Sequence, residues 1–253
     1  MKLYITGDCH GEFKKFGMAR FPEQKNLTKQ DYVIVCGDFG GIWNGDKSEK
    51  YWLDWLRNKS FTLLFVDGNH ENYDMLKEYT VEEWHGGKIH RIRDNVIHLM
   101  RGQVFEIGGN KVFTFGGASS HDIVDGILER SSPTFKQDVK NLEKKNGLYR
   151  VNHESWWEEE LPSAEEMEEG IQSLDRHNWE VDLIITHCLS TKAQDILQKK
   201  ARCHCFDSDR LTDYLSIIRS RCKFSHWFCG HYHINADITD KETILYEKIA
   251  TFE

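Results

Sequence analysis

The chain has 253 residues, of which 39% are hydrophobic, and a net charge of −8. A single domain of this length buries about 70–75% of the surface that its unfolded chain exposes, which is enough for a core built around a sheet. The acidic balance argues against a general nucleic-acid binder, because a phosphate backbone requires a basic face. It does not exclude a phosphorylated substrate, because bound metal ions would reverse the local field.

The composition predicts a cytoplasmic protein that does not enter a membrane. No stretch approaches the ~20 apolar residues of a membrane span, and residues 1–6 lead directly into the first motif without room for a signal peptide. The seven cysteines are scattered and odd in number, which is typical of a reducing compartment. Cys203-His204-Cys205 could bind zinc, but no second Cys/His pair with finger-like spacing accompanies it.

Apolar runs of strand length carry the fold prediction. They span residues 2–6, 32–36, 61–66, 183–186 and 224–229. Their lack of polar alternation is typical of strands that are covered on both faces. Between the second and third runs, Trp52, Trp55 and Leu56 fall on one face of a predicted helix over residues 49–57. A strand, a helix and a strand in this order predict a right-handed crossover in a layered α/β fold.

The middle and the tail of the chain predict a second sheet. Residues 103–107 and 111–115 flank a short Gly-rich loop, which predicts a hairpin, and we place residues 96–100 in the same, partly antiparallel sheet. Residues 236–239 and 243–249 predict another hairpin at the end. The predicted architecture is a single α/β domain over residues 1–253, with two stacked mixed β-sheets flanked by helices (α/β/β/α).

Residues from about 118 to 178 form the least regular segment and are predicted to be an insertion. Ser163 to Glu166 form a capping box, which opens a helix whose Met167, Ile171 and Leu174 face inward. The remainder carries Trp156-Trp157 and acidic runs without a second core pattern. A functional loop over a site and a solvated surface excursion both fit this composition.

Each of the five apolar runs is followed by residues that are able to bind metal. The clusters are Asp8-Cys9-His10, Gly37-Asp38, Gly68-Asn69-His70-Glu71, His187 and Gly230-His231-Tyr232-His233. If the five strand ends meet at one edge of a sheet, these side chains suit two divalent ions. Taken singly, each has an ordinary explanation, such as Asp or Asn in a turn. Five clusters together favour a metal site.

In this order the clusters resemble the calcineurin-like metallophosphoesterase superfamily, with motifs that run from Asp8 to His233. The resemblance implies metal-dependent hydrolysis of phosphate esters. It implies that Asp8, His10 and His233 hold one divalent ion, that Asn69, His187 and His231 hold a second, and that Asp38 bridges the two. Mixed carboxylate, imidazole and amide ligands suit Mn, Fe or Zn better than Ca. Two such ions would activate a bridging water and clamp the phosphate oxygens.

Other residues near the clusters are candidates for catalysis or substrate binding. His70 follows a ligand and is the predicted general acid for the leaving oxygen. Glu71 would orient His70 or a ligand, or is a surface carboxylate. Asp122 and Arg130 could reach a substrate from the segment that follows residues 111–115. For His121, in the same segment, a structural role in capping is the favoured interpretation.

Parts of two motifs are similar to the serine/threonine phosphoprotein phosphatase branch of the superfamily. That branch has a second Asp three residues after the bridging one, followed by Arg-Gly, whereas this chain has Gly41 at that position. Asp67 could replace the missing carboxylate and Arg130 the missing arginine, although neither has the spacing of the branch. Without the bidentate arginine that suits a phosphomonoester, phosphodiesters and nucleotides stay open as substrates. Trp43, Trp156 and Trp157 could stack a base.

The predicted function is therefore that of a phosphatase or phosphodiesterase. Its substrate would be a phosphorylated small molecule, a nucleotide or a phosphoprotein. One alternative is a metal-binding scaffold that has lost catalysis and binds a partner protein. Another is a nuclease of the same superfamily, although the absence of a basic stripe counts against long nucleic acid as a substrate.

Overall fold

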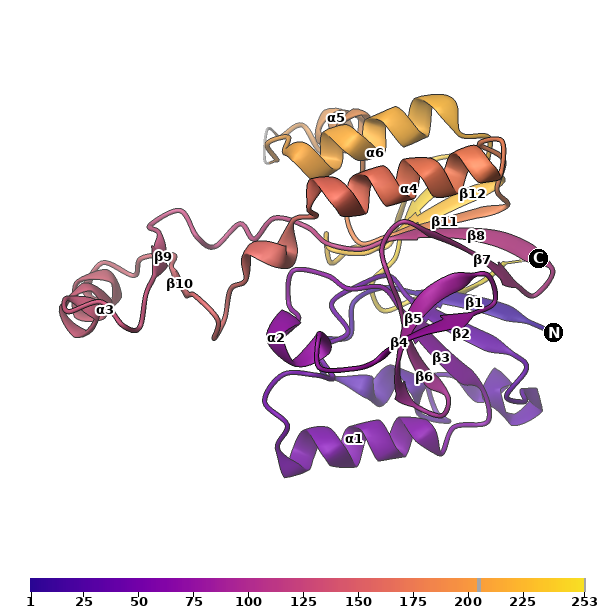
Figure 1. The fold of residues 1–253 in the computed structure, drawn as a ribbon, viewed down its shortest axis with the longest axis horizontal. Coiled ribbons are helices and arrows are strands. Elements are labelled where there is room, and N and C mark those ends of the chain that lie inside the picture. The colour runs from indigo at the N-terminus through magenta and orange to yellow at the C-terminus, as the bar shows by residue number, and fades with distance from the viewer. Residues whose placement is uncertain (204–205, 253) are drawn as a thin grey trace.

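A computed structural model describes residues 1–203 and 206–252 (Figure 1). Two mixed sheets are stacked at its centre, with helix α1 on one outer face and helices α4, α5 and α6 on the other. This arrangement confirms the predicted α/β/β/α architecture. His204 and Cys205 of the Cys-His-Cys motif lie outside the described residues. None of the described helices combines the length and apolar character needed to cross a bilayer.

The first sheet has the strand order β15-β1-β2-β3-β6-β5-β4 among the described residues. Strands β1, β2, β3 and β6 run parallel, while β15, β5 and β4 are antiparallel to their neighbours. The strands are β1 (Leu3–Thr6), β2 (Tyr32–Val35), β3 (Thr62–Phe65), β4 (Val81–Trp84), β5 (Gly87–Arg93), β6 (Val96–Leu99) and β15 (Ile249–Phe252).

The second sheet has the order β13-β14-β12-β11-β8-β7 in the described part of the chain. Strands β8, β11, β12 and β14 run parallel, and β7 and β13 are antiparallel at the two edges. The strands are β7 (Gln103–Ile107), β8 (Asn110–Phe115), β11 (Leu183–Thr186), β12 (His226–Cys229), β13 (Ala236–Thr239) and β14 (Glu242–Ile244).

The longer helices begin at side chains that cap free backbone N–H groups. Asp46 caps α1, Ser163 caps α4 within the predicted capping box, Ser190 caps α5 and Asp209 caps α6. The helices are α1 (Lys47–Arg57), α2 (Tyr73–Leu76), α3 (Phe135–Lys144), α4 (Ala164–Arg176), α5 (Thr191–Ala201) and α6 (Arg210–Arg221), with 3₁₀ turns η1 (Phe13–Phe16), η2 (Pro22–Asn26) and η3 (Glu158–Glu160).

The strands that precede the metal-binding clusters are buried on both faces, as their sequences predict. In β1, Ile5 points into the core between the two sheets, while Tyr4 packs on the opposite side with Leu53 of α1. In the second sheet, Ile185 lies in the same inter-sheet core, and Ile184 packs beneath α4 and α6. Burial on both sides fixes each strand's register, because a one-residue slip would turn every side chain to the other face.

The prediction for residues 96–100 is wrong, because β6 lies in the first sheet and not beside the β7–β8 hairpin. It pairs with β3 on one side and with β5 on the other. The turn at Asp94-Asn95 makes β5 and β6 a hairpin of their own, and Ile89 and Ile97 join the inter-sheet core. The predicted terminal hairpin is right for residues 236–239 and 243–244, which pair as β13 and β14. Residues 245–248 lie outside the strands, and Ile249 begins β15, which pairs with β1.

The segment predicted as an insertion contains both regular and extended parts. Strands β9 (Ile127–Leu128) and β10 (Arg150–Val151) pair in parallel and, together with α3, form an arm over residues 119–157 that projects from the two-sheet body (Figure 1). Helix α4, by contrast, packs on the second sheet, where Leu174 is fully buried. The chain therefore leaves the body at the end of β8 and returns to it before α4.

A buried ion pair ties the first sheet to the other layers. The Arg101 guanidinium, at the end of β6, donates to Asp67 at 2.8 Å through Nε, and both side chains are less than 5% exposed. Arg101 also donates to the backbone carbonyl of Glu159 at 2.8 Å and to Glu166 of α4 at 3.3 Å. Tyr73 donates its hydroxyl to Asp67 at 3.0 Å. The pair is thus fully hydrogen-bonded, which is the condition for a buried charge to be tolerated.

We expect Asp67→Ala to destabilise the fold strongly, because it leaves the Arg101 charge buried without its partner. The expected cost is about 3–5 kcal/mol. Urea unfolding of the metal-free protein, followed by circular dichroism, measures it. Asp94→Ala is the control, since Asp94 pairs with Arg57 at 2.9 Å on the surface, where the loss should be under about 1 kcal/mol. Equal losses in the two variants would contradict a structural role for the buried pair.

Candidate metal centre

The five predicted clusters meet where strands of both sheets end. Strands β1, β2 and β3 deliver three of them from the first sheet, and β11 and β12 deliver two from the second. The expected single sheet edge is therefore a junction between two sheets. Its loops are hydrogen-bonded to one another, as in the bonds from Cys9 N–H to the Asp38 carbonyl and from Gly230 N–H to the His187 carbonyl, each 2.9 Å long.

One group of side chains brings together Asp8, His10, Asp38 and His233. Their ligand atoms all lie within 4.8 Å of one another. His10 and His233 face each other with 2.9 Å between their Nε2 atoms. The His233 Nε2 lies 3.2 Å from Asp8 Oδ2, and the His10 Nε2 lies 3.6 Å from Asp38 Oδ2.

A second group adjoins the first through Asp38. The Nε2 atom of His187 lies 3.3 Å from Asp38 Oδ1 and 3.2 Å from Asn69 Oδ1. The ring of His231 packs edge-on against that of His187, with 5.0 Å between their centroids. Asp38 thus turns Oδ1 toward His187 and Oδ2 toward His10, which is the orientation that a carboxylate shared between two ions requires.

Neighbouring groups orient the candidate ligands. The Nδ1–H of His187 donates to the backbone carbonyl of Cys36 at 2.7 Å, which leaves Nε2 for the centre. The side-chain amide of Asn69 donates to Ser120 Oγ at 3.3 Å and thereby directs its oxygen toward His187. Glu71 is buried and accepts the backbone N–H of Phe39 at 2.7 Å, so it holds the loop that carries Asp38 and is not a surface carboxylate.

The backbone around the centre is strained. His10, Asp38, His231 and His233 all have positive φ, between 44° and 70°. Such angles are uncommon for residues other than glycine, and they cluster at functional sites where the surrounding structure imposes them.

Glycines allow the close approach of the loops. A Cβ on Gly68 would lie 2.1 Å from Asp38 Oδ1, and one on Gly230 would lie 2.1 Å from Asp8 Oδ1. Any larger residue at either position would displace a candidate ligand.

The charges of the centre are strongly coupled. Burial raises the pKa of the Asp38 carboxyl, but the neighbouring His187 outweighs burial and holds that pKa well below its usual range. Burial lowers the pKa of His187, yet the Asp38 and Asp8 carboxylates raise it to about 10. For His231, burial and the nearby His187 lower the pKa to about 3. Without an ion, a proton on His187 thus offsets part of the negative charge of the two buried carboxylates.

The donor set fits divalent metal ions. Two pairs of imidazole rings face each other near the buried carboxylates. The Nε2 atoms of His10 and His233 form one pair, and those of His121 and His231, which lie 3.0 Å apart, form the other. Neutral imidazole with carboxylate and amide oxygen is the chemistry of Mn, Fe or Zn sites. His121 was expected to have a capping role, and its ring instead faces the centre. The sequence feature that could have identified His121 is its position after a strand, which it shares with the residues of the five clusters.

His70 lies at the rim of this centre. Its backbone N–H donates to Asp38 Oδ1 at 2.7 Å, and its ring packs against that of His10 with 5.0 Å between centroids. Burial lowers the pKa of His70, although the Asp38 carboxylate opposes the shift. The ring therefore stands beside the candidate ligands without replacing any of them.

An arginine from the arm, Arg150 of β10, reaches the same place. One of its terminal nitrogens lies 3.4 Å from His70 Nε2. Asp122 binds its guanidinium through Nε at 2.9 Å and through Nη2 at 2.6 Å, and the Ser155 carbonyl accepts from Nη1 at 2.9 Å. No spacing in the sequence distinguished Arg150 from the other arginines, because it comes to the site through the fold of the arm.

Three residues with suggested roles near the site, Arg130, Asp122 and Asp67, bind other side chains. Arg130 is mostly exposed and forms an ion pair with Glu154 within the arm, so it is not among the side chains gathered at the centre. Asp122 lies beside the centre, with its carboxylate bound to Arg150. Asp67, suggested as the carboxylate that orients His70, is instead engaged by Arg101 and by His98 at 3.1 Å.

Comparison with known proteins finds similar sequences over most of the chain. The sequence model of the family described as calcineurin-like phosphoesterase matches residues 1–235. "Lariat debranching enzyme A" of Xenopus laevis is 24% identical over 254 aligned positions, covering 92% of this chain and 43% of that protein. "Lariat debranching enzyme" of Danio rerio is 22% identical over 254 positions, covering 92% and 40%. The chain thus spans less than half the length of these curated relatives.

We expect metal binding to release protons. His187 carries a proton in the ion-free protein below about pH 10, whereas a ligand imidazole is neutral, so an ion must expel that proton. Apparent affinity for Mn²⁺ should consequently rise as pH increases from about 6 to 9. Titration calorimetry in two buffers of different ionisation enthalpy measures the release. His177→Ala, which lies outside the centre, should not change the number of protons released. Binding heats that are the same in both buffers would contradict proton release.

Proposed function

This chain belongs to the calcineurin-like phosphoesterase family, and on that premise we propose that it hydrolyses phosphate esters at a centre for two divalent metal ions. Asp8, His10 and His233 would hold one ion, Asn69, His187 and His231 the other, and Asp38 both. The observation that supports two ions most directly is the orientation of Asp38, whose two oxygens face the two groups of side chains. His121, 3.0 Å from His231, is an additional candidate beside the second ion.

Mn, Fe or Zn at these positions would supply Lewis acidity to lower the pKa of a water and to neutralise the phosphate oxygens. The chain's own residues set the conditions for that chemistry. Gly68 and Gly230 let the carboxylates approach the opposite loops, and the hydrogen bond from His187 to the Cys36 carbonyl fixes its tautomer. This preorganisation means that the ligands need little rearrangement when an ion binds.

His70 is the proposed general acid. It stands at the rim of the centre beside His10 and is held through its backbone N–H, so its ring can serve the leaving oxygen without leaving a metal. Donation of a proton to that oxygen as the ester bond breaks avoids the release of a free alkoxide.

Arg150 is the proposed ligand of the substrate's phosphate. Its guanidinium is largely buried and lies next to His70, which places a permanent positive charge where an ester phosphate would meet the centre. Asp122 and the Ser155 carbonyl hold its orientation, so Asp122 acts as a positioning residue for Arg150. Arg150 thus takes the role that the sequence had suggested for Arg130.

We further propose that the substrate is a phosphodiester and not a phosphoprotein. Two relatives carry the name of lariat debranching enzymes, and the Asp and Arg of the phosphoprotein phosphatase motif are replaced here from Gly41 onward. The net charge of −8 continues to favour a nucleotide or short diester over long nucleic acid.

Turnover of p-nitrophenyl phosphate and of its bis ester, in added manganese, tests this function. We expect the bis ester to be preferred. With a diester whose leaving group is an alkoxide, such as a dinucleotide, we expect His70→Ala to lower kcat by about 10²–10⁴-fold, the usual contribution of a general acid. The variant should keep the metal content of the wild type, measured by mass spectrometry.

His177→Ala is the matched control and should retain activity, because its ring bonds the Ser173 carbonyl at the end of α4. Two bound ions without turnover of either ester would contradict an enzyme and favour the metal-binding scaffold.

Arg150→Ala should lower kcat/KM for the bis ester by about 10²-fold, because it removes a charge-assisted contact to the phosphate. Arg150→Lys should recover part of the loss, since it keeps the charge without the fork geometry.

Lys140→Ala, an exposed residue on α3 of the same arm, controls for general effects of changing the arm's charge. Arg130→Ala tests the competing assignment, and a larger loss there than in Arg150→Ala would reverse our choice of arginine.

A further inference from the structure

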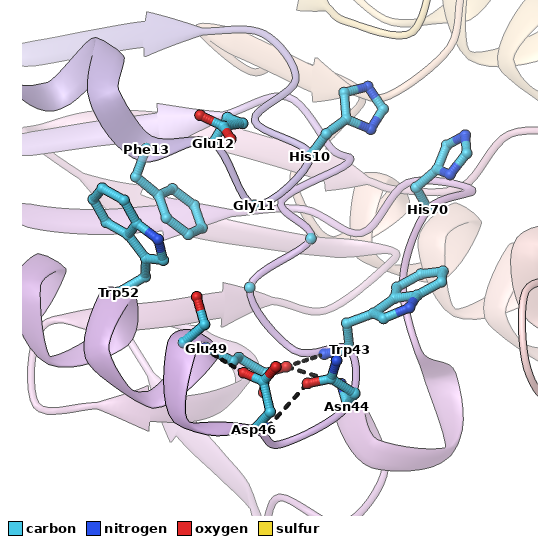
Figure 2. A pocket seen from close by; sticks show the side chains of 13 residues that line it. His10, Gly11, Glu12, Phe13, Trp43, Asn44, Asp46, Glu49, Trp52 and His70 are labelled. Carbon is cyan, nitrogen blue, oxygen red and sulfur yellow. Dashed lines mark hydrogen bonds between the residues drawn. The ribbon is translucent and has the colours of Figure 1, made fainter.

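A pocket of about 410 Å³ opens beside the metal centre and is not explained by phosphate hydrolysis alone (Figure 2). His10 and His70 line the end that lies at the centre, and residues from the segments 11–13 and 40–49, together with Trp52 of α1, line the rest. A group attached to a phosphate at the centre would therefore enter this pocket past His70. Its volume falls within the range of small-molecule sites.

Aromatic side chains form opposite walls of the pocket. Figure 2 shows Trp43 on one side and Trp52 with Phe13 on the other. Trp52 and Phe13 pack together with 6.1 Å between their ring centroids. Trp43 is supported from behind by Trp157, which is fully buried and donates its indole N–H to Asp74 at 2.8 Å. These walls present flat apolar surfaces to a ligand.

The loop that carries Trp43 is fixed before any ligand binds. The Glu49 carboxylate accepts three consecutive backbone N–H groups, from Trp43 at 2.8 Å, Asn44 at 2.9 Å and Gly45 at 3.1 Å. The Asn72 side chain donates to the Trp43 carbonyl at 2.7 Å. A wall held in this way binds a flat ring at a lower entropic cost than a mobile loop would.

Gly41 helps to shape the pocket floor. A Cβ at this position would lie 2.4 Å from Phe39 Cε1 and 3.0 Å from Phe13 Cζ. Any side chain at residue 41 would therefore clash with the buried Phe39 ring and press on Phe13 of the pocket wall. The glycine that separates this chain from the phosphoprotein phosphatase motif thus has a structural consequence next to the site.

The charge of the pocket selects the kind of group that it accepts. Its lining carries the carboxylates of Glu12, Asp46 and Glu49 and the amide of Asn44, and among the described residues it includes no Lys or Arg. Such a lining repels a second phosphate. It favours an uncharged group with N–H donors, since carboxylates accept hydrogen bonds from amino groups, as they do from the amino group of cytosine.

We propose that this pocket binds the nucleobase of a nucleotide whose phosphate lies at the metal centre, with the base against Trp43. A nucleobase combines a flat π-face, which stacks on aromatic walls, with amino donors at its edge. The proposal rests on the proposed function, because the metal centre anchors the phosphate.

Binding of two non-hydrolysable phosphonates to the manganese-loaded protein tests the pocket. The probes are the methyl monoesters of the methylenephosphonate analogues of AMP and of ribose 5-phosphate, which carry the single negative charge of a diester and differ in the presence of the base. We expect titration calorimetry to show about tenfold tighter binding of the AMP analogue, a factor that corresponds to roughly 1.4 kcal/mol of stacking. Trp43→Ala should abolish the difference, and Trp43→Phe should keep most of it.

Trp84→Ala is the matched control, because Trp84 is a partly exposed tryptophan that packs on Tyr32 and Phe105 outside the pocket. It should keep the tenfold preference. Equal binding of the two phosphonates to the wild type, binding of neither, or a preference that survives Trp43→Ala would overturn the assignment. If the protein hydrolyses esters but shows no preference for the probe with a base, base binding in the pocket is contradicted and the proposed hydrolysis stands. If it prefers the probe with a base but hydrolyses no ester, the proposed hydrolysis is contradicted and base binding stands.

Discussion

Asp8, at the end of β1, accepts the backbone N–H of His231 at 2.9 Å across the junction between the two sheets, and the arrangement of the metal centre depends on this contact. It fixes the loop after β12 against the loop after β1. The absence of a Cβ at Gly230 is what makes the approach possible. His233 is then carried to Asp8, and His231 to His187. A two-sheet fold is therefore necessary here, since neither sheet alone supplies all the candidate ligands of either group.

The arm contributes an arginine to the site at this junction. The body of the molecule contributes carboxylates, imidazoles and one amide, whereas the guanidinium of Arg150 comes from β10 in the arm. The segment that follows the arm's last strand also supplies Trp157, which supports the Trp43 wall. The proposed phosphate contact and the proposed base pocket thus both depend on this segment. A segment that sequence patterning left open between functional loop and surface excursion has contacts that favour the functional loop.

Much of the architecture could be predicted because the central strands are buried on both faces, so their sequences are continuous apolar runs. The capping box at Ser163 was equally local and identified the start of α4. The placement of β6 failed for the opposite reason. Its partner was decided by the turn at Asp94-Asn95 and by competition for the inter-sheet core, and neither is visible in the strand's own residues.

By itself, the sequence determined the order of the strands that precede the clusters, the identity of the candidate ligands and the family resemblance, because short motifs directly behind buried strands are local features. The tertiary structure alone decided which other side chains contact the candidate ligands and their neighbours. Arg150, and not Arg130, lies beside His70. His121 faces His231, and Asp67 accepts hydrogen bonds from Arg101. Those pairings join segments far apart in the chain, and packing, not local pattern, determines which of several similar residues comes within bonding distance.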